Sequence, residues 1–257
     1  MDDSFVICQI SDMHFIDSSE RLYNQIHTAT QFIKTINFCN KLNPQPDIYI
    51  MSGDLIHDKS EYYKKFINIS NQLKKPYYLM MGNHDDRSEL IKIIKNKKLI
   101  DKSGFVNFSL NKFPIKIICL DTVINRTDEG KITTSTMEWL KNELDKNFNK
   151  PIIIFMHHPP INIGSVLMDK IKCLNGNDFL NLTGQYKNIL KIVFGHVHCK
   201  FKKKIESQEL ISCPSSSFQF PIEAKSTINI KCSNQGFIQL FKWGKNQHLD
   251  ISVINIS

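Results

Sequence analysis

The chain lacks a long apolar run, although apolar residues make up 41% of its 257 residues. Its longest such run, from Ile152 to Met156, has the length of a strand. A membrane-spanning helix would need roughly 18 apolar residues. The start, Met1-Asp2-Asp3-Ser4, is acidic, whereas a secretory signal peptide begins with basic residues. We therefore expect a cytoplasmic protein that has a sizeable core and no contact with a membrane.

Paired cysteines are also lacking, because the 7 cysteines include no Cys-x-x-Cys pair. The odd count and the length of the chain favour reduced thiols over a disulfide scaffold. Acidic residues are fewer than basic ones, which gives a net charge of +8 and lysine clusters at residues 92–98 and 200–204. No aromatic residues interleave with these lysines, as a surface that stacks nucleic-acid bases would require. Nucleic acid is therefore not an expected partner.

The order of sequence patterns predicts an α/β protein. Short apolar strands are expected at residues 5–10, 47–51, 77–81, 105–110, 115–120, 152–156 and 190–194. Amphipathic helices are expected at residues 20–40, 61–73 and 86–97, and from residue 135 onward. Ser18 or Ser19 would cap the first helix, and the capping box Ser135-Thr136-Met137-Glu138 would open the last. After Lys200 only short strands follow, so we expect one domain over residues 1–257 with a β-rich part from about residue 200. The expected architecture is a four-layer α-β-β-α sandwich of two mixed sheets flanked by helices.

Polar motifs follow five of these strands: Asp12-Met13-His14, Gly53-Asp54, Gly82-Asn83-His84-Asp85, His157-His158-Pro159-Pro160 and Gly195-His196-Val197-His198. The carboxyl ends of strands in α/β sheets are where ligand sites collect. Aspartate, histidine and asparagine without thiolates suit Mn, Fe, Zn or Co. A glycine before Asp54, Asn83 and His196 permits a sharp turn and a close approach of the backbone. Each motif alone is weak evidence, but the ordered set indicates a metal site.

This order of motifs, over residues 5–198, resembles that of the calcineurin-like metallophosphoesterases and implies their fold. The resemblance implies that seven side chains hold two metal ions: one ion by Asp12, His14 and His198, the other by Asn83, His157 and His196, and both by Asp54. It implies that His84 stands beside the substrate phosphate without binding a metal. Asn83 and His198 would also lie near the substrate. Mn or Fe is the expected metal, with Zn or Co as alternatives.

Two such metal ions would hold a hydroxide between them and clamp a phosphoryl group for in-line attack. His84 would protonate the leaving oxygen, a role that typically contributes roughly 10²–10⁴-fold. Asp85 would either orient the His84 imidazole or favour the dipole of the helix that follows. The roles of His57, His158 and Arg87 stay open between contact with the substrate and an ordinary structural or surface position.

Further segments resemble the bacterial class III cyclic-nucleotide phosphodiesterases. They are the Gly82–Arg87 motif, Thr136-Met137-Glu138-Trp139-Leu140, residues 213–220 and Gln235-Gly236-Phe237-Ile238. Ser216 stands where that family usually has a threonine. The resemblance implies hydrolysis of 3′,5′-cyclic AMP to 5′-AMP. Phe218 or Phe220 would stack on adenine, or both would fill the core.

The alternatives to a cyclic-AMP phosphodiesterase are a broader phosphodiesterase, for example on glycerophosphodiesters, a nuclease, and a metal-free interaction scaffold. A nuclease would need an added DNA-binding module, and a scaffold would have lost its ligands, whereas every ligand position here is filled. The sequence does not determine the oligomeric state, and a homodimer is compatible with it.

Overall fold

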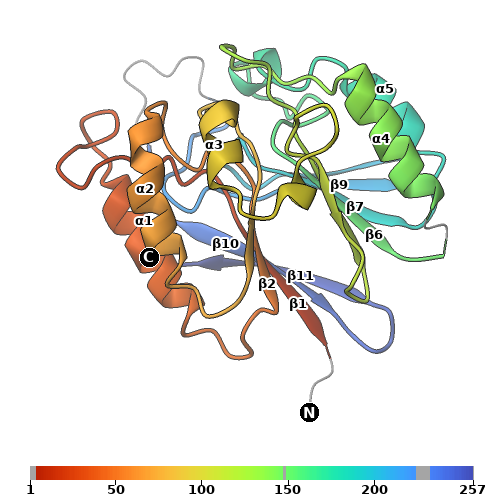
Figure 1. Ribbon diagram of the computed structural model, residues 1–257, viewed down its shortest axis with the longest axis horizontal. Coiled ribbons are helices and arrows are strands. Elements are labelled where there is room, and N and C mark those ends of the chain that lie inside the picture. The colour runs from red at the N-terminus through yellow and green to blue at the C-terminus, as the bar shows by residue number, and fades with distance from the viewer. Residues whose placement is uncertain (1–3, 147–148, 224–231, 257) are drawn as a thin grey trace.

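The computed structural model describes residues 4–146, 149–223 and 232–256, which form two sheets packed face to face (Figure 1). The first sheet has five strands in the order β11-β10-β1-β2-β3. Its strands are β1 (Phe5–Ile10), β2 (Ile48–Met51), β3 (Tyr77–Leu79), β10 (Phe237–Trp243) and β11 (Leu249–Asn255). β1, β2 and β3 run parallel, whereas β10 and β11 pair antiparallel. This sheet is therefore mixed.

The second sheet has six strands in the order β4-β5-β6-β7-β9-β8. Its strands are β4 (Phe108–Leu110), β5 (Lys116–Leu120), β6 (Ile152–Met156), β7 (Ile189–Phe194), β8 (Lys202–Ile205) and β9 (Gln208–Ser212). β5, β6, β7 and β9 are parallel, and the edge strands β4 and β8 are antiparallel to their neighbours. The β-rich part after Lys200 thus completes both sheets, because β8 and β9 join this one and β10 and β11 join the other.

Helices cover the outer faces of both sheets. α1 (Thr28–Cys39) and α2 (Tyr63–Ser70) lie on the first sheet, and α4 (Thr134–Asp145) and α5 (Gly176–Thr183) lie on the second (Figure 1). α3 (Arg87–Ile93) follows β3, and short 3₁₀ helices occur at Ser60–Tyr62, Lys97–Leu99 and Met168–Lys170. The predicted sandwich of two mixed sheets flanked by helices is confirmed. Within the described ranges, no helix is long and apolar enough to cross a membrane.

The boundaries of the helices differ from the prediction, most of all for α1. This helix begins only at Thr28, so a cap at Ser18 or Ser19 is wrong. Before it, the amide of Leu22 donates to the Ile26 carbonyl in a turn, and Asn24 has a positive φ of 57°. Leu22 and Ile26 are both buried although they lie in a turn, and their spacing of four residues is the same as that of apolar residues on one face of a helix.

The predicted start of α4 was also wrong, by two residues. The cap is Thr133, whose hydroxyl accepts from the amide of Thr136 at 3.1 Å. The two helices after β2 and β3 are shorter than expected, and Asp86 caps α3 by accepting from the amide of Glu89.

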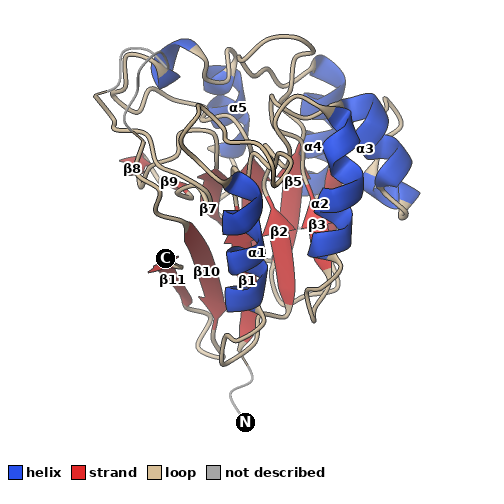
Figure 2. Cartoon of the chain, turned by 90° about the vertical axis from the view of Figure 1, so that its left-hand side faces the viewer, coloured by secondary structure: helices blue, strands red, loops and turns tan. Residues whose placement is uncertain are grey.

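The core lies between the sheets and under the helices. Phe155 in β6 and Phe241 in β10 are fully buried, and their rings meet edge to face with centroids 5.5 Å apart. Because the parallel strands of each sheet point the same way, the loops that leave their carboxyl ends gather at one edge of the sandwich (Figure 2). All seven cysteines lie within the described ranges and are free thiols, as expected.

Candidate metal centre

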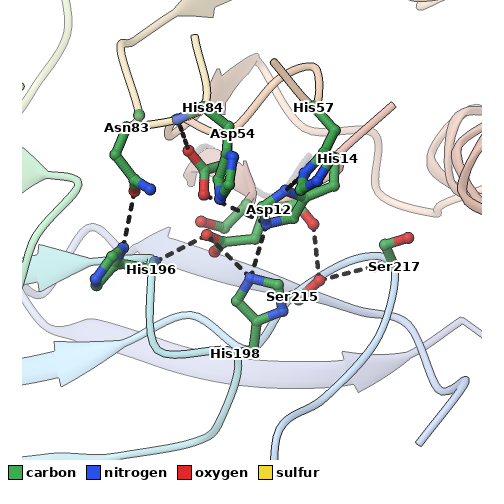
Figure 3. A network of polar contacts seen from close by, with 12 residues as sticks. Asp12, His14, Asp54, His57, Asn83, His84, His196, His198, Ser215 and Ser217 are labelled. Atoms are coloured by element: carbon green, nitrogen blue, oxygen red, sulfur yellow. Dashed lines mark hydrogen bonds and ion pairs between the residues drawn. The ribbon is translucent and has the colours of Figure 1, made fainter. Parts of the chain in front are cut away.

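The backbone at this edge turns sharply at the residues that carry the polar side chains. Positive φ angles occur at Asp12, His14, Asp54, His196 and His198, which are all candidate ligands. Left-handed φ is uncommon for residues other than glycine and persists only where the surroundings impose it. The five turns let side chains from the loops after β1, β2 and β7 point toward one another (Figure 3).

The first cluster contains Asp12, His14, Asp54 and His198, whose ligand atoms all lie within 4.8 Å of one another. The Nε2 atoms of His14 and His198 are 3.0 Å apart, and His14 Nε2 is 3.3 Å from Asp54 Oδ2. His198 Nε2 is 3.6 Å from Asp12 Oδ1. These four side chains are buried.

The second cluster gathers around the amide oxygen of Asn83. This oxygen lies 3.0 Å from His196 Nδ1 and 3.2 Å from His157 Nε2. His157 Nε2 lies 3.4 Å from Asp54 Oδ1. The two oxygens of Asp54 therefore face different clusters, because Oδ2 lies toward His14 and Oδ1 toward His157.

The donor atoms fit metal ions better than they fit one another. Two ligands bound about 2.0–2.2 Å from one ion, and about 90° apart, lie about 3 Å from each other. The facing nitrogens of His14 and His198 have that spacing, although two imidazole lone pairs repel unless a cation or proton separates them. Asp12 Oδ2 and His196 Nε2 are buried without a hydrogen-bond partner among the described residues. The cluster of His and Asp is thus suited to a dinuclear metal site.

Hydrogen bonds to carbonyl oxygens orient two of the imidazoles. His157 Nδ1 lies 2.9 Å from the Ser52 carbonyl, and His198 Nδ1 lies 3.0 Å from the Phe218 carbonyl. A carbonyl can only accept, so Nδ1 carries a proton in both rings and Nε2 is the nitrogen that faces the cluster.

Burial and neighbouring charges set the protonation of the site. Burial lowers the pKa of His14, His196 and His198, so these imidazoles are neutral near pH 7. Burial raises the pKa of Asp12 to about 7. Burial alone would raise the pKa of Asp54 as well, but the surrounding histidines, His157 foremost, hold it well below its usual range. Burial lowers the pKa of His157 as well, but the Asp54 carboxylate outweighs this and raises it to about 9, so this imidazole would lose a proton to a bound cation.

Close backbone approach explains two of the glycines. A Cβ atom at Gly53 would lie 2.5 Å from His157 Nδ1 and 2.6 Å from the Met81 carbonyl oxygen. A Cβ atom at Gly82 would collide with the amide nitrogen and the carboxylate of Asp54. The loops after β2, β3 and β6 can therefore meet only where these side chains are absent, as the sequence indicated.

Comparison with known proteins decides the family, since a model of the calcineurin-like phosphoesterase family matches residues 5–200. The chain belongs to this family. It is 28% identical to a probable glycerophosphodiester phosphodiesterase of Arcobacter nitrofigilis, over 95% of this chain and 90% of that protein. It is 27% identical to a 3′,5′-cyclic-nucleotide phosphodiesterase of Nostoc, over 90% of this chain and 85% of that protein.

A solved structure with the same fold is a dimetal phosphatase from Danio rerio. It superimposes with a TM-score of 0.70, at 12% identity, over 98% of this chain and 99% of that one. At this identity the likeness shows the fold alone. The family assignment and the donor cluster together make this calcineurin-like phosphoesterase a hydrolase with a site for two metal ions.

His84 lies beside the donor clusters of this phosphoesterase site, and a residue that the sequence analysis missed holds it. Its backbone amide donates to Asp54 Oδ1 at 3.0 Å, and its Nδ1 donates to Asp58 Oδ1 at 2.7 Å. Burial lowers the pKa of His84, but Asp54 and Asp58 outweigh this and raise it to about 9. An aspartate four residues after Asp54 carries no sequence signal of this role.

Neither interpretation of Asp85 was right. Its buried carboxylate accepts from the amides of Leu55 at 3.1 Å and Gly82 at 2.9 Å, and from the Tyr63 hydroxyl at 3.0 Å. It therefore fixes the loop after β3 to the loop after β2. The His84 imidazole pairs with Asp58 instead, and Asp86 is the carboxylate at the start of α3.

Arg87 and His158 have structural partners. Arg87 donates to both oxygens of Asp121, at 2.8 and 2.9 Å, so the arginine holds α3 to the loop after β5. His158 Nδ1 lies 2.7 Å from the Thr122 hydroxyl, and its Nε2 lies 3.2 Å from the Asp128 carbonyl. These contacts occupy both nitrogens of His158. They favour the structural alternative for both residues.

Residues 213–220 pack against the loop after β1 and against His198. The Ser215 hydroxyl donates to the Asp12 carbonyl at 2.7 Å, and the Ser216 hydroxyl donates to the Ser11 carbonyl at 3.1 Å. Phe218 is fully buried and packs against His198 with ring centroids 4.4 Å apart, and Phe220 is also buried. Stacking of Phe218 on adenine is therefore wrong, and the alternative that these rings fill the core is confirmed.

Replacement of Asp54 by asparagine should abolish tight binding of two metal ions, because an amide has only one oxygen and no charge to offer both clusters. The measurement is metal content by mass spectrometry after gel filtration. Asp250→Asn, at an exposed position in β11, is the control and should keep wild-type metal content. Two tightly bound ions in Asp54→Asn would contradict the shared position of this carboxylate.

Proposed function

We propose that the chain is a phosphodiesterase that hydrolyses 3′,5′-cyclic AMP to 5′-AMP with two metal ions. The observation that supports this most is the arrangement of two donor clusters around Asp54, with His84 held on their open side by Asp58. A relative that matches 90% of the chain is named as a cyclic-nucleotide phosphodiesterase.

The proposed ligands follow the two clusters. Asp12, His14 and His198 would hold one ion, Asn83, His157 and His196 would hold the other, and Asp54 would serve both. Oxygen and imidazole donors without thiolate favour Mn or Fe, with Zn or Co as alternatives. When bound, two such ions activate the attacking water and offset the charge that develops on the phosphoryl group.

His84 is the proposed general acid. Asp58 accepts the Nδ1 proton of His84 at 2.7 Å. Burial lowers the pKa of His84, but Asp54 and Asp58 raise it to about 9, so near pH 7 the ring also carries a proton on Nε2, the nitrogen available to the substrate. Protonation of the leaving alcohol by Nε2 avoids the release of a strongly basic alkoxide. The hydrogen bond from the His84 backbone amide to Asp54 Oδ1 keeps the acid beside the clusters.

The leaving alcohol would occupy a cavity of about 410 Å³ beside His84. It is lined by Asp58, Asn83, His84, Asp85, Asp86, Arg87, Ser88, Val123, Asn125 and Arg126. Apart from the imidazole of His84, none of these residues is aromatic, so the cavity offers a nucleobase little stacking surface.

A second candidate substrate class follows from this lining. Carboxylates, amides and guanidinium groups suit the hydroxyls of a small polyol, and a relative that matches 95% of the chain is named as a probable glycerophosphodiester phosphodiesterase. Glycerophosphodiesters are therefore the proposed alternative to cyclic AMP.

The proposal also includes the cellular compartment and the domain organisation of the enzyme. Seven free thiols suit the reducing cytoplasm. We propose one catalytic domain over residues 1–257, and a homodimer stays a prediction.

A substrate panel tests the proposal. We expect the Mn-loaded protein to convert cyclic AMP to 5′-AMP with a higher kcat/KM than cyclic GMP, glycerophosphocholine or bis(p-nitrophenyl) phosphate. Product analysis by chromatography identifies which ester bond breaks. A preference for glycerophosphocholine would select the second candidate, and no turnover of any diester would reject both.

Removal of the acid should affect substrates unequally. His84→Ala should keep both metal ions and lower kcat for cyclic AMP by roughly 10²–10⁴-fold. The loss should be much smaller for bis(p-nitrophenyl) phosphate, because nitrophenolate leaves without a proton. Asp58→Asn should show the same pattern more weakly. Equal losses on both substrates, or loss of metal, would contradict the assignment of His84 as the acid.

A further inference from the structure

His57 contacts both a candidate metal ligand, His14, and the proposed acid, His84, and neither the proposed ligand sets nor the acid step uses it (Figure 3). Its Nδ1 is 3.1 Å from His14 Nδ1. Its ring stacks on the His84 ring, with centroids 4.4 Å apart and an angle of 26° between the planes. Its side chain is 18% exposed, so both contacts are largely shielded from water.

The position of His14 determines which nitrogen carries its proton. His14 Nε2 faces the donor atoms of His198 and Asp54, at 3.0 and 3.3 Å. A nitrogen that binds a cation must offer a lone pair, so the proton of a neutral His14 belongs on Nδ1. Two facing Nδ1 atoms form a hydrogen bond only if one carries a proton. His14 Nδ1 therefore donates, and His57 Nδ1 accepts.

This arrangement differs from that of the neighbouring imidazoles. His157 and His198 donate from Nδ1 to the carbonyls of Ser52 and Phe218, which can only accept. His14 depends instead on a side chain that could donate or accept. The tautomer of His57 thus decides whether His14 can present its lone pair to the cluster.

The other nitrogen of His57 faces the partner of His84. With Nδ1 as acceptor, His57 carries its proton on Nε2, which lies 3.7 Å from Asp58 Oδ2. The other oxygen of Asp58 accepts from His84 Nδ1. One carboxylate therefore faces both rings of the stack and favours the His57 tautomer that accepts from His14.

We propose that His57 is a positioning residue that accepts the Nδ1 proton of His14 and so holds the Nε2 lone pair of His14 toward the metal site. Asp58 supports this tautomer from the far side of the ring, and the stacked ring keeps His84 beside the same site. The inference rests on the proposed function only in that the clusters bind metal. It requires no particular substrate.

Two substitutions separate this role from mere packing. His57→Asn keeps an acceptor, because Oδ1 can take the place of Nδ1, whereas His57→Ala removes it. We expect His57→Ala to weaken binding of Zn²⁺, measured by competition with a chromophoric chelator, by about 10- to 100-fold. His57→Asn should stay within about threefold of wild type. His27→Ala, at an exposed histidine, is the control and should change nothing.

A spectroscopic measurement tests the tautomer of the metal-loaded protein without substrate. Long-range ¹H–¹⁵N correlation spectra of the Zn²⁺-loaded protein should show His14 protonated on Nδ1 and His57 protonated on Nε2. In His57→Ala, His14 should lose this single tautomer, and in His57→Asn it should keep it. Assignment comes from the disappearance of each ring's signals in the His57 variants and in His14→Gln.

The outcomes are separable from those of the proposed function. Protonation of His57 on Nδ1 in the wild type, or equal Zn²⁺ affinity in His57→Ala and wild type, would overturn the inference. Equal weakening in the Ala and Asn variants would also overturn it, because an acceptor would then not suffice. Failure to hydrolyse cyclic AMP would reject the substrate and leave these measurements unaffected.

Discussion

The carboxylate of Asp54 is the point on which the site depends. Its two oxygens face two sets of nitrogen and oxygen donors, and each set contains side chains from the loops of both sheets. A buried charge is costly unless it is paired and hydrogen-bonded. Here the His84 amide and three nearby histidines stabilise it and keep its pKa low. Without a cation, several of the other ligand atoms face one another or lack a hydrogen-bond partner in the described parts of the chain. The cluster is therefore an arrangement that a bound metal completes.

This site requires that several residues other than glycine keep strained, left-handed backbone conformations. Left-handed φ angles at residues such as Asp12 and His198 cost of order 1–3 kcal/mol each. The surroundings that impose them are visible in the structure. The Ser215 and Ser216 hydroxyls bind the carbonyls of Asp12 and Ser11, and the Asp85 carboxylate ties the loop after β3 to that after β2. The C-terminal segment thus contributes to the site without supplying a ligand.

The sequence predicted the features of this protein that depend on the spacing of apolar residues and on the order of motifs along the chain. β6 has the predicted bounds because five consecutive apolar residues between Pro151 and His157 can be recognised directly, and the motif order pointed to the family. Features that depend on long-range contact were missed. Asp58 and His57 acquire their roles only when β2 and β3 lie side by side, and Asp85 looked like a partner of its neighbour His84. The turn at Leu22 resembled a helix because burial from a turn and from a helix can share the same spacing.

The central claim is that Asp54 joins two donor clusters into one dinuclear centre. Anomalous diffraction from crystals grown with Mn²⁺ tests it most directly. The account predicts two peaks about 3.5–4 Å apart, one bounded by His14 and His198, the other by Asn83 and His157, with one oxygen of Asp54 directed at each. A single peak, or a second ion held by His158 with Asn83 unused, would contradict it.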